Sequence, residues 1–219
     1  MREIDEIISQ IVKNKTFLDI GPCWLTVNEK MSVAFRAGAQ KVTGIDMFEE
    51  QTEHVANLRE RLKQLGVSYE FHSGTKLEDY QVSHDVVYCS GVAYHQASPH
   101  LFFQKMNQLT NEHLILKSTV TPNKIGDFNM PAGSAIFMPA ISETDREAIA
   151  LDWQEFLKGN PASGLNIPKY DWNAKDSHGW WWLFTPEFLL SQVQIAGFEL
   201  AKHQLTPDNR QLIIHARKV

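Results

Sequence analysis

Short apolar runs alternate with amphipathic segments along the first 120 residues of this chain. The apolar runs predict strands at Thr16–Ile20, Lys41–Asp46, Ser68–His72, His84–Ser90 and Glu112–Val120. Between them, apolar residues recur at helical spacing and predict helices at Asn28–Ala37, Glu49–Leu65 and His100–Leu109. Strands that alternate with helices are typical of a doubly wound α/β domain with a parallel sheet.

This alternation stops at about Pro122. Residues 122–183 are rich in Pro, Gly, Asn and aromatic residues, and we expect them to form an inserted substrate cap with one helix at Glu143–Leu157. Before the first strand, Ile4–Val12 predicts an amphipathic helix within residues 1–15. We expect that helix to cover the site from its N-terminal side.

The end of the chain predicts one more helix and a hairpin. Thr185-Pro186-Glu187 supplies an N-cap, a proline at the first helical position and an early acid, and Gly197 ends the helix. Phe198–Leu205 and Gln211–Arg217 flank a Thr-Pro-Asp-Asn turn and predict an antiparallel hairpin. We therefore expect a single domain, residues 1–219, with a Rossmann-like, mostly parallel, seven-stranded sheet that ends in this hairpin.

Two of the predicted strands bring acids to the same edge of the sheet. The first contains Asp19 and leads into Gly21, and the second ends in Asp46. Ligands of open α/β sheets bind outside the carboxyl ends of the strands, and glycine lets the backbone approach a ligand closely. An acid at the end of the second strand is placed to bind both hydroxyls of a ribose. The pattern predicts a nucleotide-type site with Asp46 as the ribose ligand.

Leu18-Asp19-Ile20-Gly21 resembles the first motif, D/E-x-G-x-G-x-G, of the class I S-adenosylmethionine (SAM) methyltransferases, and Gly44-Ile45-Asp46 resembles their second motif. The resemblance covers nearly the whole chain and implies SAM as the cofactor. Cys23 and Leu25 stand where the later glycines of the first motif belong, and the segment from Trp24 to Lys30 is longer than usual. The chain departs most from the family at the methionine end of the site.

The resemblance implies further cofactor contacts. Asp19 has two interpretations: it binds the cofactor's amino group directly or through water, or it orients the loop by accepting backbone N–H bonds. Met47 and Phe48 follow Asp46 where an apolar contact to adenine would lie, and Thr75 stands near the place of a family acid that binds the adenine amine. Ser90 ends the fourth strand and opens the segment that should line the crevice.

The segment Ser90–Pro99 carries the candidate chemistry. Gly91-Val92-x-Tyr94-His95 and Ser98-Pro99 resemble a loop of the tRNA wobble-uridine carboxymethyltransferases, which take a carboxylated SAM (carboxy-SAM). That resemblance implies that Tyr94 contacts the extra carboxylate, whereas a packing role is the alternative. His95 is the candidate base, because an imidazole that titrates near neutrality can deprotonate a hydroxyl or amine. The alternative is that His95 holds the loop by hydrogen bonding.

The predicted cap concentrates aromatic side chains. Three consecutive tryptophans cannot all face a core from one regular element, so we expect at least one to face the cleft. We predict substrate contacts from Tyr170, His178, Trp181 and Trp182; the alternative is that the aromatic residues roof the sheet, as most tryptophans are buried by packing. No second histidine stands at metal-ligand spacing from His178, so no metal is predicted.

Composition and charge narrow the possible partners. The formal net charge of −5 disfavours a nucleic-acid partner without excluding one. Two cysteines without C-x-x-C spacing are typical of reduced thiols in a cytoplasmic protein. No apolar stretch approaches the length of a membrane span. The sequence leaves the oligomeric state open.

Three functions fit these observations. The first is a SAM-dependent methyltransferase that acts on a small, partly aromatic or apolar molecule. The second is an RNA-modifying enzyme of the wobble-uridine type that uses SAM or carboxy-SAM. The third is a degenerate methyltransferase fold that binds a partner without catalysis, with Cys23 and Leu25 filling the cofactor loop.

Overall fold

The computed structural model describes residues 2–24, 26–121, 124–125, 128–156, 180–207 and 209–219. Its centre is a seven-stranded sheet in the order β10-β11-β5-β4-β1-β2-β3. The parallel strands are β1 (Thr16–Ile20), β2 (Lys41–Ile45), β3 (Glu70–His72), β4 (His84–Ser90) and β5 (Thr110–Thr119). β11 (Gln211–Lys218) runs antiparallel to β5 and to β10 (Phe198–Leu205). The predicted sheet and its terminal hairpin are confirmed.

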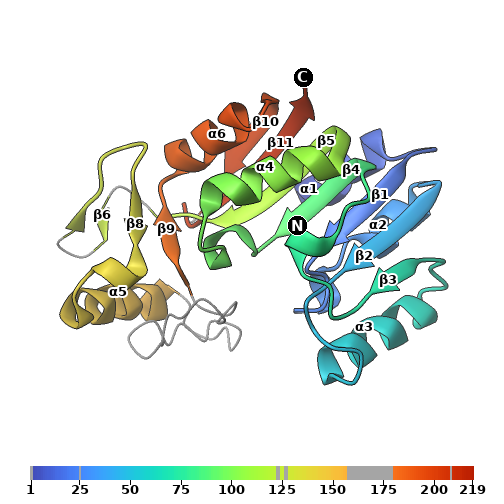
Figure 1. Cartoon of the computed structure of the whole chain (residues 1–219), viewed down its shortest axis with the longest axis horizontal. Helices are drawn as coiled ribbons and strands as arrows, with labels where there is room; N and C mark the ends of the chain where they lie inside the picture. The colour runs from blue at the N-terminus through green and yellow to red at the C-terminus, as the bar shows by residue number, and fades with distance from the viewer. Residues whose placement is uncertain (1, 25, 122–123, 126–127, 157–179, 208) are drawn as a thin grey trace.

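Helices cover both faces of this sheet (Figure 1). α1 (Arg2–Ile11), α2 (Met31–Arg36) and α3 (Glu53–Gln64) pack on one face, and α4 (Pro99–Leu109) and α6 (Pro186–Ile195) pack on the other. Neighbouring strand residues contribute to opposite faces: Phe17 belongs to the core cluster beneath α1, α2 and α3, and Leu18 belongs to the core cluster beneath α4 and α6. Strands buried on both sides need apolar residues at every position, which is why the apolar runs predicted them well.

Two helices begin later than the sequence pattern predicted. α2 starts at Met31 rather than Asn28, because residues Thr26–Asn28 form a separate 3-10 turn. α3 starts at Glu53 rather than Glu49, because the hydroxyl of Thr52 accepts the N–H of Val55 and caps the helix there.

The N-terminal helix α1 is a layer helix rather than the predicted cover over the site. Its Ile4, Ile7 and Ile8 are buried in the same core cluster as Phe17 and Met31. The helix still reaches the first loop, because the carboxylate of Asp5 lies 2.7 Å from Nζ of Lys30. In the part of the chain that the structure describes, no helix is long and apolar enough to cross a membrane.

The segment between β5 and α6 lies at one end of the sheet (Figure 1). It contains α5 (Glu143–Phe156) and two small antiparallel pairs that the sequence did not predict. These pairs are β6 (Lys124–Ile125) with β7 (Phe128–Asn129), and β8 (Ala135–Phe137) with β9 (Trp182–Phe184). The structure also contains the short 3-10 turns η2 (Leu77–Asp79), η3 (Ala93–His95) and η4 (Met138–Ala140).

Gly44 sets how closely α2 packs on β2. A Cβ added at Gly44 would lie 2.8 Å from Sδ of Met31 and 3.1 Å from Cδ2 of Phe71. We expect Gly44→Ala to lower the free energy of unfolding by about 1–3 kcal/mol through overpacking, measured by urea denaturation. In a Met31→Ala background the added methyl should cost less, and equal costs in both backgrounds would show that Met31 is not the source of the crowding.

Candidate active site

The predicted acids lie at the carboxyl ends of adjacent strands. β1 lies between β2 and β4, and Asp19 pairs in register with Gly44 on one side and Tyr88 on the other. Gly21 follows β1 with a φ of +78°, a conformation that favours glycine, and its N–H donates to the carbonyl of Ile45. The strand order reverses between β1 and β4, and an open α/β sheet is expected to bind its ligand at this edge.

Asp19 is buried and holds the start of α2. Its Oδ2 accepts the N–H of Lys30 at 2.7 Å, and the side chain is 1% exposed in the folded chain. Burial raises the pKa of Asp19 to about 8; the Lys30 N–H opposes this shift, and the charge of Glu29 adds to it. This contact corresponds to the second interpretation of Asp19, in which the carboxylate orients the loop.

Asp46 is the point where three loops meet. Its Oδ2 accepts the N–H of Cys23 at 2.9 Å, and its Oδ1 accepts the N–H of Phe48 at 3.1 Å. The thiol of Cys23 is also hydrogen-bonded to Asp46. Burial is the main cause that raises the pKa of this thiol, and the negative charge of Asp46 is the second. The backbone carbonyl of Asp46 accepts the N–H of Thr75 at 2.9 Å. The three hydrogen bonds to the carboxylate leave one of its lone pairs to accept a hydroxyl, and a second hydroxyl could take the place of the weak thiol donor.

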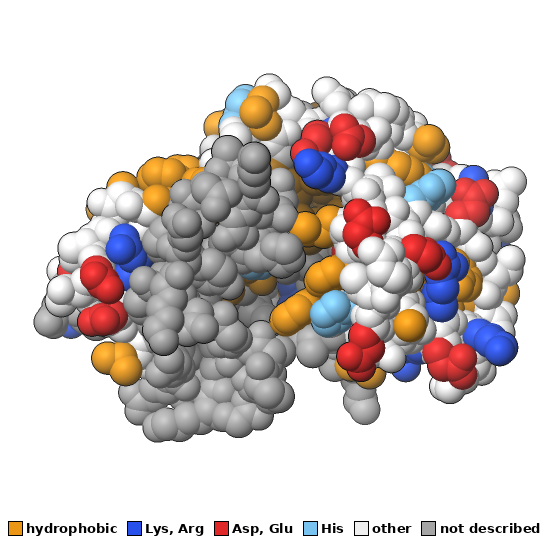
Figure 2. Space-filling view, turned by 60° about the horizontal axis from the view of Figure 1, so that its bottom comes forward, with side chains coloured by type: hydrophobic (Ala, Val, Ile, Leu, Met, Phe, Trp, Pro, Cys, Tyr) orange, Lys and Arg blue, Asp and Glu red, His pale blue; other side chains and the backbone are white. Residues whose placement is uncertain are grey.

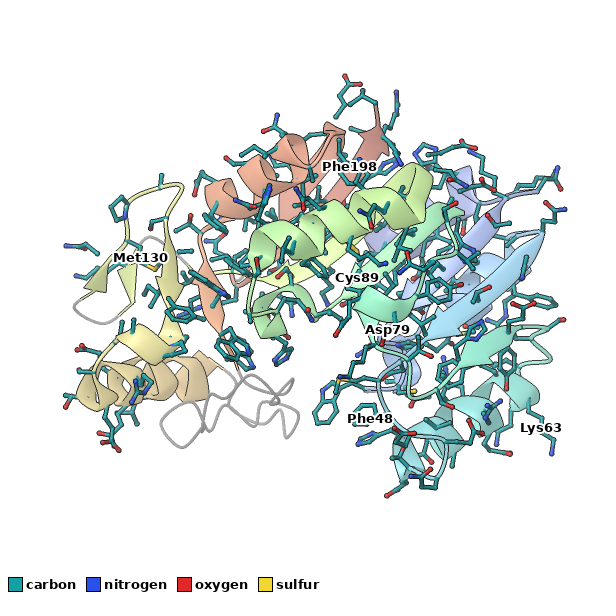
Figure 3. All side chains as sticks on the ribbon, viewed as in Figure 1. Phe48, Lys63, Asp79, Cys89, Met130 and Phe198 are labelled. Atoms are coloured by element: carbon teal, nitrogen blue, oxygen red, sulfur yellow. The ribbon has the colours of Figure 1, made fainter. Side chains whose placement is uncertain are left out.

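An aromatic cluster lies beside Asp46 and was not predicted from the sequence. Trp24, Phe48 and His54 form this loop aromatic cluster, whose ring centroids are 4.4 to 6.5 Å apart. Trp24 is 54% exposed and Met47, the residue between Asp46 and Phe48, is 38% exposed. Figure 3 shows Phe48 at the edge of the part of the molecule that contains β2 and α3, on the side nearer α5. The signal in the sequence was the tryptophan that stands between Cys23 and Leu25, the two residues that replace glycines of the first motif.

The loop after β4 forms the other side of the crevice. Ser90 pairs in register with Lys117 of β5, and the N–H of Gly91 donates to the carbonyl of Lys117. η3 then places Tyr94 and His95 next to each other, with ring centroids 4.4 Å apart. The hydroxyl of Tyr94 is hydrogen-bonded to Thr119, and burial raises the pKa of Tyr94 to about 12.

Strand β9 is hydrogen-bonded to this loop. The N–H of Trp181 donates to the carbonyl of Tyr94 at 3.0 Å, and Nε1 of Trp182 donates to the carbonyl of Ala97 at 3.2 Å. Trp180 is the tryptophan whose ring contacts both candidate residues. Its ring centroid lies 4.2 Å from that of Tyr94 and 6.0 Å from that of His95. The segment after β5 is therefore fixed to the loop that carries Tyr94 and His95.

The sequence analysis named Trp181 and Trp182 but not Trp180. Trp182 packs against the core with Phe184, whereas the ring of Trp181 stacks 6.1 Å from that of Phe137. Alternation along an extended segment puts Trp180 on the side of Trp182, and that periodicity was the available signal. The other two predicted substrate residues, Tyr170 and His178, lie outside the described residues.

The two sides of the crevice lie on either side of β1. Asp46 follows β2, Tyr94 follows β4, and β1 lies between them, so the two loops are separated by two strand spacings, roughly 10 Å. Figure 2 shows a hollow in the molecule with hydrophobic side chains on its wall. Among the described residues no group of three or more His, Cys, Asp or Glu side chains could hold a metal ion.

Residues 18–113 match the sequence model of a family described as methyltransferase domain. The matched region, from β1 into β5, is therefore similar to a methyltransferase domain. A comparison with curated proteins finds no match. Solved structures with the same fold include the magnesium protoporphyrin IX methyltransferase of Synechocystis PCC 6803 with bound SAH (S-adenosylhomocysteine), at 13% identity and a TM-score of 0.61; the alignment covers 100% of this chain and 83% of that one.

Two further structures show the range of proteins that share the fold of this chain. The [4+2]-cyclase SpnF aligns at 12% identity and a TM-score of 0.61, over 99% of this chain and 80% of that one. The cyclopropane synthase MmaA2 of Mycobacterium tuberculosis aligns at 16% identity and a TM-score of 0.57, over 93% of this chain and 62% of that one. At these identities the likeness shows the fold, and function has to be argued from the site.

The raised pKa of Asp19 predicts a pH dependence of stability. Between the ordinary pKa of an aspartate, about 3.9, and a folded-state pKa of about 8, the folded chain holds a proton that the unfolded chain has lost. This group therefore lowers the free energy of unfolding as pH rises through that range, by up to ~1.4 kcal/mol per pH unit. We expect Asp19→Asn, which cannot ionise, to gain stability relative to the wild type between about pH 5 and pH 8, measured by urea denaturation.

The exposed Asp79 offers a matched control for this measurement. Asp79→Asn should keep a constant difference from the wild type across the same pH range. A constant difference for Asp19→Asn as well would contradict a buried, protonated carboxyl at that position.

Proposed function

We propose that this protein is a SAM-dependent methyltransferase that acts on a small, partly aromatic or apolar molecule. The observation that carries the proposal is the pairing of two features across one crevice. A buried carboxylate, Asp46, stands beside the glycine turn at Gly21, and a histidine, His95, stands among aromatic rings on the loop after β4. The methyltransferase-domain match over residues 18–113 and the fold shared with a SAH-bound methyltransferase support this interpretation.

The residues around Asp46 fit the nucleoside part of SAM. The carboxylate would bind the ribose hydroxyls, the backbone at Gly21 would lie close to the ligand, and Met47 and Thr75 would flank the adenine. A Cβ at Gly21 would lie 3.1 Å from Cγ2 of Val92, so a larger residue would crowd the wall between the two loops. Asp19 supports the methionine end by fixing the loop through Lys30.

The acids around this loop suit a cationic ligand. The charges of Asp46 and Glu29 both raise the pKa of Asp19, and the nearby Lys30 already forms an ion pair with Asp5. SAM carries a positive sulfonium and supplies an electrophilic methyl group. Because Glu29 is also ion-paired, with Arg61, the carboxylate of Asp46 is the acid of this group that would attract such a cation.

The acceptor would lie on the side of His95. His95 would take the proton from a hydroxyl or amine as it attacks the methyl group, and the rings of Tyr94 and Trp180 would orient a planar or apolar acceptor. Trp181 and Trp182 hold this wall in place through their hydrogen bonds to the Tyr94 and Ala97 carbonyls. An aromatic wall of this kind favours a substrate with aromatic or apolar parts.

A transfer assay with methyl-labelled SAM tests the proposal. Each reaction contains the purified protein, labelled SAM and one acceptor. The acceptors are a panel of phenols, aromatic carboxylic acids and aromatic amines, and bulk tRNA. Label in a small molecule together with release of SAH supports the proposal. Label in tRNA alone would favour the RNA-modifying alternative, and SAM binding without transfer to any acceptor would favour a binding protein.

Removing the carboxylate of Asp46 should weaken cofactor binding. A charge-assisted contact to two hydroxyls contributes enough that Asp46→Ala should lower the affinity for SAH by about 10- to 100-fold, measured by titration calorimetry. Asp46→Asn keeps an acceptor for the N–H of Cys23 and separates loss of charge from collapse of the loop. Asp79→Asn, on an exposed turn, should leave the affinity unchanged, and an unchanged affinity in both Asp46 variants would refute the ribose assignment.

His95→Ala should slow the chemical step. Loss of a general base lowers turnover by about two to four decades, while the affinity for SAH should change little. The matched control is His100→Ala, because His100 is exposed at the start of α4 and its ring contacts Gln104. Single-turnover kinetics on an acceptor from the panel distinguish the roles: near-normal turnover across the pH range would assign His95 to loop architecture.

A further inference from the structure

Lys117 places a charge in the apolar centre of β5, near the carboxyl end of that strand. It directly follows three fully buried residues, 114–116, and is itself partly buried. It is also the only Lys or Arg in β4 and β5, two strands that the structure describes in full. Lysine is rare in such surroundings, because partial burial weakens the hydration of its ammonium group. A partly buried ammonium also attracts an anion more strongly than one in open solvent does.

The strand register fixes the position of this side chain. Lys117 pairs with Ser90 of β4 on one side and with Ile213 of β11 on the other, each roughly 5 Å away. Paired residues point to the same face of a sheet, and Ile213 belongs to the core cluster beneath α1, α2 and α3. The N–H of Gly91 donates to the carbonyl of Lys117 at 3.1 Å. Lys117 therefore lies beside the start of the loop after β4.

A pair of hydroxyls lies two residues further along β5, on the same face. Thr119 and Lys117 are two residues apart, so their side chains share a face and their Cα atoms are roughly 7 Å apart. Thr119 is hydrogen-bonded to the hydroxyl of Tyr94, and a Cβ at Gly91 would lie 3.3 Å from that hydroxyl. One O–H of the pair is used in this mutual hydrogen bond, which leaves the other as a donor to a ligand. Because the lysine stem is flexible, its ammonium can reach a carboxylate held by that O–H.

This edge of the sheet has charges of opposite sign at its two ends. Asp46 follows β2, Lys117 lies near the end of β5, and the two strands are three spacings, roughly 14 Å, apart. A cationic ligand is attracted to the first position and an anionic ligand to the second. The ring of Tyr94 lies 4.4 Å from that of His95 and 4.2 Å from that of Trp180. An aromatic acceptor stacked against these rings would extend from His95 toward Lys117.

We propose that Lys117 binds a carboxylate of the acceptor, which makes the substrate an aromatic acid with its nucleophilic hydroxyl or amine at the opposite end, beside His95. This inference rests on the proposed function and narrows its substrate class. In the transfer, the acceptor oxygen or nitrogen forms a bond to the methyl carbon while the methyl–sulfur bond breaks, its proton passes to His95, and SAH is released. The carboxylate stays on Lys117 and does not react. A charge-assisted hydrogen bond of this kind changes affinity by about 10- to 100-fold.

Titration calorimetry on the full chain, in the presence of SAH, tests this assignment with 3-hydroxybenzoate, 4-hydroxybenzoate and 2-aminobenzoate. Each acid is compared with its neutral methyl ester, which has the same ring and nucleophile. The wild type should bind at least one acid about 10- to 100-fold more tightly than its ester. Lys117→Met, which removes the charge and keeps a long side chain, should bind that acid and its ester equally. Lys117→Arg, which keeps the charge, should retain a preference for the acid.

Lys63→Met is the matched control, because Lys63 is an exposed lysine of α3 (Figure 3), and this variant should bind acid and ester as the wild type does. Circular dichroism verifies that each variant is folded. The affinities of the wild type and Lys117→Met for SAH and carboxy-SAM are measured in parallel, because both compounds carry carboxylates of their own. Transfer reactions with labelled SAM on the same acids and esters show which atom receives the methyl group.

The outcomes separate this inference from the proposed function. If no acid binds the wild type more tightly than its ester, or if Lys117→Met keeps the preference, the carboxylate assignment is overturned, whereas methyl transfer to the neutral esters would leave the proposed function standing. A loss of affinity for SAH or carboxy-SAM in Lys117→Met, without a loss for the acids, assigns Lys117 to the cofactor and also overturns the inference. Label on the carboxylate itself does the same. If the preference depends on Lys117 but no acceptor is methylated, the carboxylate site stands and the proposed function fails.

Discussion

The hydrogen bond from the N–H of Lys30 to the buried carboxyl of Asp19 holds the candidate site together. It ties the end of β1 to the start of α2, where helix N–H groups have no partner within the helix. Because α2 packs directly on Gly44, the same contact also fixes β2 and the turn that bears Asp46. The loop between Gly21 and Lys30 is therefore anchored at both ends, and its middle can carry a side chain such as Trp24 without loss of the frame.

The parallel core could be predicted because its strands are apolar on both faces. The bounds of β1 and β4 agree with the apolar runs, and the positions of Asp19 and Asp46 followed from strand ends. The small pairs β6-β7 and β8-β9 could not be predicted, because strands of two or three residues depend on their partners rather than on their own pattern. The sequence analysis named Trp181 and Trp182 and missed Trp180, whose ring lies against Tyr94 and His95 and which the alternation of side chains groups with Trp182.

The crevice has a different character on its two sides. Around Asp46 it is built from backbone N–H groups, a glycine turn and carboxylates, which depend on the fold shared with a methyltransferase, a cyclase and a cyclopropane synthase. Around His95 the crevice is built from aromatic rings, one of them supplied by the segment after β5. This chain need not share that segment with the three solved structures. Under the proposed function, the choice of acceptor would therefore depend on the second side.

The ends of the segment between β5 and α6 are hydrogen-bonded to each other. The N–H of Thr121 donates to the carbonyl of Phe184, and the N–H of Thr185 donates to the carbonyl of Ser134. The segment thus leaves and rejoins the sheet through one narrow neck. In evolution, such a connection lets the intervening residues be lengthened, shortened or exchanged as a unit while the parallel core folds as before. Descendants of one ancestral scaffold can then acquire new substrates by replacing a single stretch of chain.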